Sequence, residues 1–189
     1  MILSDRQIIE RCQGDTPMLT PFFAHQVATL GSRRLVSYGL SSYGYDIRLA
    51  REYLMGPRSA NVALDPKAMH DGLFRRCTAN GAIAMPPHSF LLGASMEHFT
   101  MPMDILGLCV GKSTYARIGV IVNVTPLEPG WQGILTLEIS NTTDCVALLY
   151  PEEGIAQIVF AQGSEPPLTS YASRQGKYQD QVAAAIARL

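Results

Sequence analysis

The fold is decided most clearly by one stretch of the sequence, Ile134-Leu-Thr-Leu-Glu-Ile-Ser-Asn141, in which apolar and polar side chains alternate. Successive side chains of a β-strand point to opposite faces, so Leu135, Leu137 and Ile139 share one face and the polar residues share the other. This alternation predicts a strand with one buried face. Glu138 lies on the polar face, where a lone glutamate is either a solvated surface residue or a functional group, and the pattern leaves both interpretations open.

Short apolar runs bounded by glycine and proline continue on both sides of this strand. Many short strands at this spacing predict an all-β sandwich, barrel or jelly roll. The expected strands are Leu35–Tyr38, Tyr45–Leu49, Ala82–Met85, Phe90–Ser95, Glu97–Thr100, Leu106–Val110, Val120–Val124, Ile134–Ile139, Val146–Tyr150 and Ile155–Phe160.

Helices are expected mainly at the N-terminus. Ser4 and Gln7 have the spacing of a capping box and predict a short helix over residues 4–13. A second helical turn is expected around Phe23–Thr29, and residues 55–80 are expected to form a long loop with about one helical turn. The stretch Ala183–Leu189 has helix-forming composition but is too short for a stable helix.

The composition is that of a soluble protein of 189 residues with a formal net charge of −1. We expect one domain over residues 1–189, since there is no internal repeat or linker. General nucleic-acid binders carry a basic face, which is not expected here. The basic residues form short local groups that suit a small anionic ligand instead: Arg33-Arg34, Arg75-Arg76, and Lys112 with Arg117.

No membrane association is expected, because no apolar run approaches the ~18 residues of a membrane span. The N-terminus has no pattern of a secretion signal, so a cytoplasmic location is expected. The charged fraction of 16% is lower than a typical ~25% and favours surface buried in an oligomer.

Metal-binding patterns are not found in the sequence. The four cysteines form no Cys-x-x-Cys pair and are expected to be buried free thiols: Cys12, Cys77, Cys109 and Cys145. Zinc-dependent cytosine deaminases carry His-x-Glu and Pro-Cys-x-x-Cys motifs. The four histidines are scattered and are expected to be structural or exposed: His25, His70, His88 and His98. We therefore expect neither zinc nor any other metal held by protein ligands.

A second segment with chemical potential is Gly111-Lys-Ser-Thr-Tyr-Ala-Arg117. It is superficially similar to a P-loop, but that motif requires a glycine five residues before the Gly-Lys pair, where this chain has Leu106. The segment still offers one lysine, two hydroxyls and one arginine, which together suit an anion or polar ligand. The alternative is a solvated helix N-terminus that Ser113 caps, and the composition does not decide between the two.

Together, six motifs in the same order resemble bacterial dCTP deaminase, a member of the dUTPase-like superfamily. The resemblance covers nearly the whole chain. The motifs are Ser41-Ser-Tyr-Gly-Tyr-Asp-Ile-Arg48, Gly111-Lys-Ser-Thr-Tyr-Ala-Arg117, Val122-Asn-Val-Thr-Pro-Leu-Glu-Pro129, Thr136-Leu-Glu-Ile-Ser-Asn-Thr-Thr143, Gly154-Ile-Ala-Gln157 and Gly176-Lys-Tyr-Gln179.

The resemblance implies a mainly β fold, the distorted jelly roll or β-clip of the dUTPase-like superfamily, with a short N-terminal helix. It implies a hydrolase that deaminates dCTP to dUTP and ammonia without zinc and so supplies dUTP for dUMP and dTTP synthesis. It also implies a homotrimer with active sites at subunit interfaces, Mg²⁺ held mainly by the substrate triphosphate, and inhibition by dTTP at the same site.

The resemblance also implies roles for individual residues. Glu138 matches the catalytic general base and acid, Ser113 matches the serine that holds the attacking water, and Arg117 matches the arginine that organises both. The remaining positions implied to contact the nucleotide are Lys112, Thr114, Tyr115, Ala116, Thr136, Leu137, Gln157, Tyr171, Lys177 and Gln181.

Two positions depart from related patterns. Asp180 stands where many relatives have glycine, beside the expected phosphate contacts. Glu128 stands where bifunctional deaminase–diphosphatases and dUTPases have aspartate, which favours a monofunctional deaminase. The alternatives are a bifunctional enzyme that forms dUMP and a catalytically silent nucleotide-binding regulator on the same fold.

Overall fold

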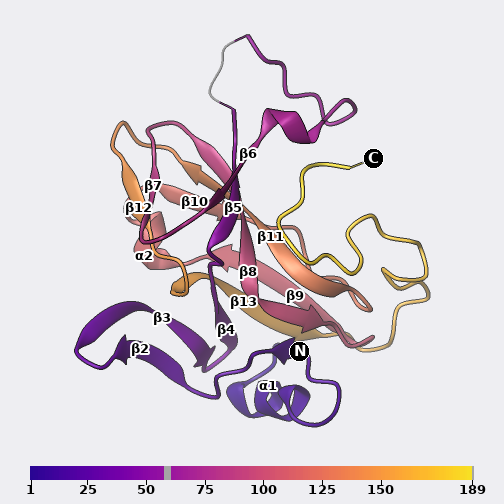
Figure 1. Cartoon of the computed structure of the whole chain (residues 1–189). Coiled ribbons are helices and arrows are strands. Elements are labelled where there is room, and N and C mark those ends of the chain that lie inside the picture. The colour runs from indigo at the N-terminus through magenta and orange to yellow at the C-terminus, as the bar shows by residue number, and fades with distance from the viewer. Residues whose placement is uncertain (58–60, 189) are drawn as a thin grey trace.

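The computed structural model describes residues 1–57 and 61–188. Its strands form two large antiparallel sheets, in the orders β10-β11-β8-β5-β6 and β2-β3-β4-β13-β9, and a small β12-β7 sheet (Figure 1). Strand β1 adds to β8 at the first sheet. The strands are β1 (Leu19–Thr20), β2 (Gln26–Leu30), β3 (Arg33–Ser41), β4 (Gly44–Arg48), β5 (Glu52–Met55), β6 (Arg75–Thr78), β7 (Ile83–Met85), β8 (Phe90–Thr100), β9 (Ile105–Gly111), β10 (Val120–Asn123), β11 (Gln132–Asn141), β12 (Ala147–Leu149) and β13 (Gly154–Gln162).

The helices are few and short, so the expected mainly β fold class is confirmed. They are α1 (Asp5–Cys12), the 3₁₀ turn η1 (Asp71–Leu73) and α2 (Ser113–Ala116). Helix α1 has the expected capping box, in which the Ser4 backbone N–H donates to Gln7 Oε1 at 3.1 Å. None of the described helices is long and apolar enough to span a membrane.

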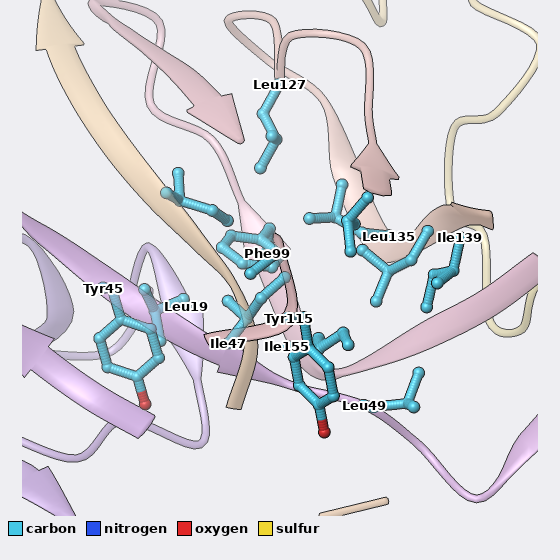
Figure 2. Packing of buried hydrophobic residues seen from close by; sticks show 14 of the residues in the cluster. Leu19, Tyr45, Ile47, Leu49, Phe99, Tyr115, Leu127, Leu135, Ile139 and Ile155 are labelled. Carbon is cyan, nitrogen blue, oxygen red and sulfur yellow. The ribbon is translucent and has the colours of Figure 1, made fainter. Parts of the chain in front are cut away.

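The core lies between the two large sheets and follows the alternation seen in the sequence. Leu135, Leu137 and Ile139 of β11 are buried, while the polar residues between them are only partly covered. Figure 2 shows Leu135 and Ile139 pointing into the same apolar cluster as Phe99 of β8 and Ile47 of β4. Burial of this cluster is the main stabilising contribution to the fold.

An ion pair between β4 and β8 joins the two sheets inside this core. Arg48 Nε lies 2.8 Å from Glu97 Oε1, and the Arg48 backbone N–H donates to Glu97 Oε2 at 2.9 Å. The side chains are 9% and 0% exposed. The guanidinium of Arg48 also lies over the rings of Phe23 and Tyr38, at 4.8 and 5.0 Å from their centres. A buried charge pair of this kind depends on both partners being present.

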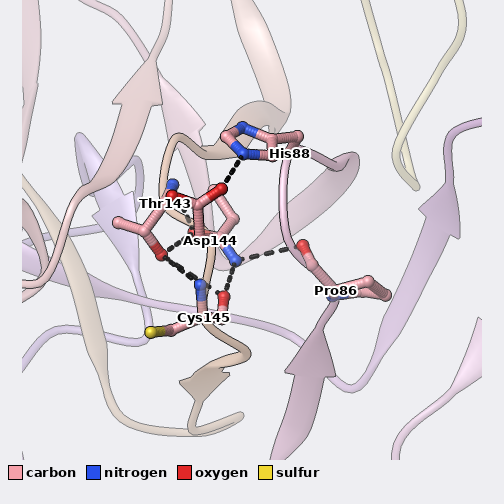
Figure 3. A network of polar contacts seen from close by, with 6 residues as sticks. Pro86, His88, Thr143, Asp144 and Cys145 are labelled. Atoms are coloured by element: carbon pink, nitrogen blue, oxygen red, sulfur yellow. Dashed lines mark hydrogen bonds and ion pairs between the residues drawn. The ribbon is translucent and has the colours of Figure 1, made fainter.

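A polar network joins the loops at the far end of β11, and Figure 3 shows Pro86, His88, Thr143, Asp144 and Cys145 in this network. The amide nitrogen of Asn141 lies 3.0 Å from the Pro86 carbonyl and 2.7 Å from the Cys145 carbonyl. His88 Nε2 lies 2.8 Å from Asp144 Oδ1 across the same two loops. This histidine is therefore an exposed residue that contacts another exposed side chain.

Several sequence-based expectations were wrong or incomplete. No helical turn forms at Phe23–Thr29; residues 26–30 are the strand β2, because the chain turns back at Gly31 (φ +61°) and pairs with β3. The expected strands Phe90–Ser95 and Glu97–Thr100 form one strand, β8. The loop expected over residues 55–80 contains β6, and its residues 58–60 lie outside the described part.

Candidate active site

A cavity of about 360 Å³ lies along the polar face of β11. Apolar side chains of β8 and of the loop before η1 form much of its wall, including Phe90, Leu92 and Met69. The polar groups that face the cavity include Thr136 and Glu138. A mostly apolar cavity with a few convergent polar groups is the usual form of a small-molecule site.

Glu138 is the titratable group of this cavity. Its neighbours on β11, Leu137 and Ile139, are fully buried, so the strand backbone is held by the core and the carboxylate is fixed on the opposite face. Burial raises the pKa of Glu138, and a hydrogen bond to its own backbone opposes this shift only in part. Its Oε2 atom is buried and has no hydrogen-bond partner among the described residues. A carboxyl group in this state is suited to exchange a proton with a ligand.

A half-buried thiol, that of Cys109 on β9, lies near this carboxyl group. Burial raises the pKa of Cys109 to about 12, and the charge of Glu138 adds to the shift. The four cysteines are free, as expected, but only Cys12 is buried and Cys145 is exposed. The expectation that all four are buried is therefore wrong.

The second predicted cluster lies on α2 and outside the cavity lining. Tyr115 is buried and its hydroxyl accepts the Tyr150 backbone N–H at 3.1 Å, which anchors the helix. Ser113 and Arg117 are exposed and do not line the Glu138 cavity, and the neighbouring Thr114 and Ala116 are exposed too. The N-cap residue is Lys112 and makes no side-chain cap, so Ser113 does not cap the helix.

Lys112 and Gln157 both contact the Ser41–Arg48 motif. Lys112 Nζ forms an ion pair with buried Asp46, which also accepts Gln26 Nε2 at 2.8 Å. Gln157 Nε2 donates to Ser41 Oγ at 3.3 Å. Within one chain the structure therefore places the predicted residues in two groups, one beside α2 and one beside Glu138.

The group beside Glu138 includes residues of the C-terminal tail, which packs along β11 (Figure 1). Ile134 N–H donates to the Gln181 carbonyl at 2.7 Å. Thr136 Oγ1 accepts Gln181 Nε2 at 2.7 Å and the Ala185 backbone N–H at 3.0 Å. Tyr171 also lines the cavity, whereas Leu137 points into the core and Lys177 Nζ donates to the Arg188 carbonyl at 3.3 Å.

The sequence did not indicate three other parts of the lining. Trp131, Tyr178 and residues 185–187 face the cavity. Trp131 is buried in the core, and its Nε1 donates to the Tyr178 carbonyl at 2.9 Å. The tryptophan beside a turn glycine could have indicated that Trp131 contributes to the cavity. The tail has no apolar periodicity, so the sequence did not indicate that it packs against the cavity.

Asp180 stands where many relatives have glycine, and its backbone has a left-handed conformation. Its φ is +57°, a conformation that glycine adopts freely and that aspartate tolerates better than most residues. Its carboxylate contacts Gln132 Nε2 of β11. The backbone geometry therefore accounts for both residue types at this position.

Glu128 pairs with a residue of the tail, and its side chain is 39% exposed. Its carboxylate forms an ion pair with Arg174, whose guanidinium lies over the Tyr171 ring at 5.2 Å.

No group of three or more His, Cys, Asp or Glu among residues 1–57 and 61–188 is placed to hold a metal ion.

We predict that Thr136→Val releases the tail from β11. Valine has a similar shape but no acceptor, so the donors of Gln181 and Ala185 lose their partner at a cost of about 1–3 kcal/mol. Trypsin cleavage after Lys177 should become roughly tenfold faster or more. Ser140→Ala, on the same face of β11 and away from the tail, should leave the cleavage rate unchanged. Equal rates in the two variants would contradict the docking role of Thr136.

These features define a mainly β protein with a carboxyl group of raised pKa in a mostly apolar cavity. The chain belongs to the dCTP deaminase-like family, whose model matches residues 2–163. It is 47% identical to dCTP deaminase of Acidobacterium capsulatum over 100% of this chain and 99% of the relative. It is 46% identical to dCTP deaminase of Azotobacter vinelandii over 96% of each chain.

A solved structure supports the fold assignment. The 2′-deoxycytidine 5′-triphosphate deaminase from Agrobacterium tumefaciens matches with a TM-score of 0.62 and 19% identity. The match covers 86% of this chain and 48% of that chain, so this protein spans about half of the solved chain.

Proposed function

We propose that this protein hydrolyses dCTP to dUTP and ammonia without zinc. The observation that carries the proposal is Glu138, a carboxyl group with a raised pKa and one unpartnered buried oxygen in an apolar cavity. The relatives that match the chain over its full length are dCTP deaminases. The dUTP that forms is the precursor of dUMP and, through it, of dTTP.

The reaction adds water to C4 of the cytosine ring and releases the 4-amino group as ammonia. In the proposed mechanism the Glu138 carboxylate takes a proton from the attacking water, and the new C–O bond forms at C4. The glutamic acid then returns the proton to the ring or leaving nitrogen as the C–N bond breaks. Positioned acid–base help of this kind contributes ~10²–10⁴-fold to the rate.

The water needs hydrogen bonds that orient it and stabilise the developing charge. We assign this role to Ser113 and Arg117, which are exposed on α2 of the same chain and lie outside its Glu138 cavity. In the proposed homotrimer a neighbouring subunit supplies them. Exposed apolar residues near α2 give this contact a surface: Leu108, Val110, Ile118, Ile121 and Leu148.

Mixing two inactive variants tests the shared site. Protomers with Glu138→Gln and protomers with Arg117→Met should each lack activity, and refolded mixtures should regain about a quarter of the sites, since each ring interface pairs subunits at random. Sedimentation of the unaltered protein should give a trimer. A persistent monomer, or no recovery of activity in the mixtures, would contradict the interface.

The triphosphate requires cations. We assign Lys112 and Lys177 to it, together with Mg²⁺ that enters with the phosphates, because no described side-chain group forms a metal site alone. dTTP is expected to compete for the same cavity. The ion pair between Glu128 and Arg174 supports a monofunctional deaminase, because it occupies the carboxylate that a diphosphatase would use on a water.

The products decide the function. Protein treated with EDTA and then supplied with dCTP and Mg²⁺ should accumulate dUTP and ammonia, resolved by ion-pairing chromatography. Prompt dUMP and pyrophosphate would assign the bifunctional reaction instead. Unchanged dCTP with detectable binding would assign a nucleotide-binding regulator.

A further inference from the structure

Glu138 belongs to a row of side chains that crosses one face of its sheet. Residues directly opposite each other on paired antiparallel strands are neighbours on the same face. Glu138 of β11 lies opposite Leu92 of β8, which in turn lies opposite Leu54 of β5, and the row ends at Arg76 of β6. On its other side Glu138 lies opposite Asn123 of the edge strand β10. The carboxyl group therefore has one apolar and one polar cross-strand neighbour.

Leu92 covers the apolar side of the Glu138 carboxyl group. Its side chain is 8% exposed and lines the same cavity as Glu138, whereas Asn123 on the opposite flank is exposed. Leu54 is buried to a similar degree, with 6% exposed, but it does not line this cavity. Adjacent strands lie about 4.8 Å apart, so Leu92 is one strand spacing from Glu138 and Leu54 is two. Leu92 is thus placed to keep water from the carboxyl group, and Leu54 is not.

Charged groups contribute little to the surroundings of this carboxyl group. The titratable residues near it are Cys109 on β9, whose pKa of about 12 keeps the thiol neutral, and the tail residues Tyr171 and Tyr178. No lysine, arginine, histidine or aspartate is among the described residues that line the cavity. Arg76 lies three strands away along the row. Burial is the largest cause of the raised pKa of Glu138, so the residues that exclude water from it control its protonation.

We infer that Leu92 is a positioning residue of the proposed reaction, because its side chain keeps water away from Glu138 and so allows the carboxyl group to hold a proton. The inference rests on the proposed function, in which Glu138 takes a proton from water and returns it. A carboxyl group transfers protons most effectively when its pKa lies near the working pH, and removal from water moves it in that direction. Arg117, which the proposed function brings from a neighbouring subunit, acts in the opposite direction but is common to all variants.

The test compares Leu92→Asn with the matched control Leu54→Asn. Asparagine has a similar size and brings a hydrated polar group into the row. The titration of Glu138 is followed by NMR of protein with ¹³C-labelled glutamate, and its signal is assigned with Glu138→Gln. In Leu92→Asn the midpoint should lie about one pH unit lower than in the unaltered protein. It should be unchanged in Leu54→Asn and in Leu92→Met, which keeps an apolar side chain of similar volume.

The pH profile of dCTP turnover gives a second readout. The acid limb of kcat/KM should move to lower pH in Leu92→Asn, because the carboxylate stays ionised further into the acid range. At a pH below both midpoints, kcat/KM relative to each protein's own maximum should therefore rise roughly tenfold. Lost packing lowers the stability of both asparagine variants, but it moves neither the NMR midpoint nor the acid limb. If the asparagine variants do not fold, Leu92→Ala and Leu54→Ala are compared in the same way.

The NMR titration separates this inference from the proposed function, because it needs no turnover. An unchanged Glu138 midpoint in the Leu92 variant, or an equal shift in the Leu54 variant, overturns the inference whether or not dCTP is deaminated. A midpoint that falls only in the Leu92 variant supports the exclusion of water by Leu92. The same fall in a protein that leaves dCTP unchanged would remove the proposed function and, with it, the role of Leu92 in the reaction.

Discussion

Replacing Glu138 with glutamine is expected to reduce turnover of dCTP by ~10²–10⁴-fold while dCTP still binds. Glutamine has nearly the same shape and fits the same position on β11, but it does not accept and return a proton. Turnover is measured by ammonia release and binding by calorimetry. Glu128→Gln is the matched control, because its carboxylate pairs with Arg174, and it should retain most of the activity.

The pH dependence of the unaltered protein gives a second readout of the same group. Glu138 acts first as a base, so kcat/KM is high where the carboxylate is ionised and falls as the pH drops through its pKa. Burial raises that pKa above the ordinary value for glutamate. The acid limb of the profile should therefore lie at a higher pH than that of an exposed glutamate. Near-normal turnover of Glu138→Gln would remove this residue from the mechanism.

Replacing Arg48 with methionine is expected to reduce the free energy of unfolding by about 3–5 kcal/mol at pH 8, because it leaves a buried charge without its partner. The side chain of Glu97 is 0% exposed and has Arg48 as its ion-pair partner. Urea unfolding measures the change. The matched control is Arg51→Met, which breaks the exposed pair with Glu152 and should change stability little.

The loss should depend on pH in a defined direction. Burial raises the pKa of Glu97, and the contacts with Arg48 lower it. Without Arg48 the folded-state pKa rises further, so the penalty is fully present above that pKa. It shrinks as the pH falls and the carboxyl group becomes protonated. An Arg48→Met protein as stable as Arg51→Met at pH 8 would show that the pair does not hold the two sheets together.

Features set by local sequence were predicted well. The capping box of α1 depends on Ser4 and Gln7 alone, and the alternation in β11 follows from the core face that Leu135, Leu137 and Ile139 share. Both are short-range patterns that the tertiary structure keeps. The mainly β fold followed from the repetition of such patterns along the chain.

Features set by distant partners were not predicted. Strand β5 has only four residues and is stabilised by pairing with β6 and β8, which lie well beyond any local window. Residues 26–30 form the strand β2 because β3 pairs with them. Local periodicity carries no information about such partners.

The candidate site shows the same division. The sequence named Glu138, Thr136, Tyr171 and Gln181, and the structure places all four at one cavity. The sequence also named Ser113 and Arg117, and the structure places both outside the cavity. Their position depends on how the chain folds, which the motif did not indicate. The lining by Tyr178 and residues 185–187 depends on how the tail packs along β11, which its composition did not indicate.

The most direct test of hydrolytic deamination is turnover of dCTP in water enriched in ¹⁸O, with the products analysed by mass spectrometry. The account predicts one ¹⁸O atom in the base of dUTP, at the carbon that lost the amino group, and none in the phosphates. Incorporation of ¹⁸O into phosphate, or dCTP that stays unchanged under these conditions, would contradict it.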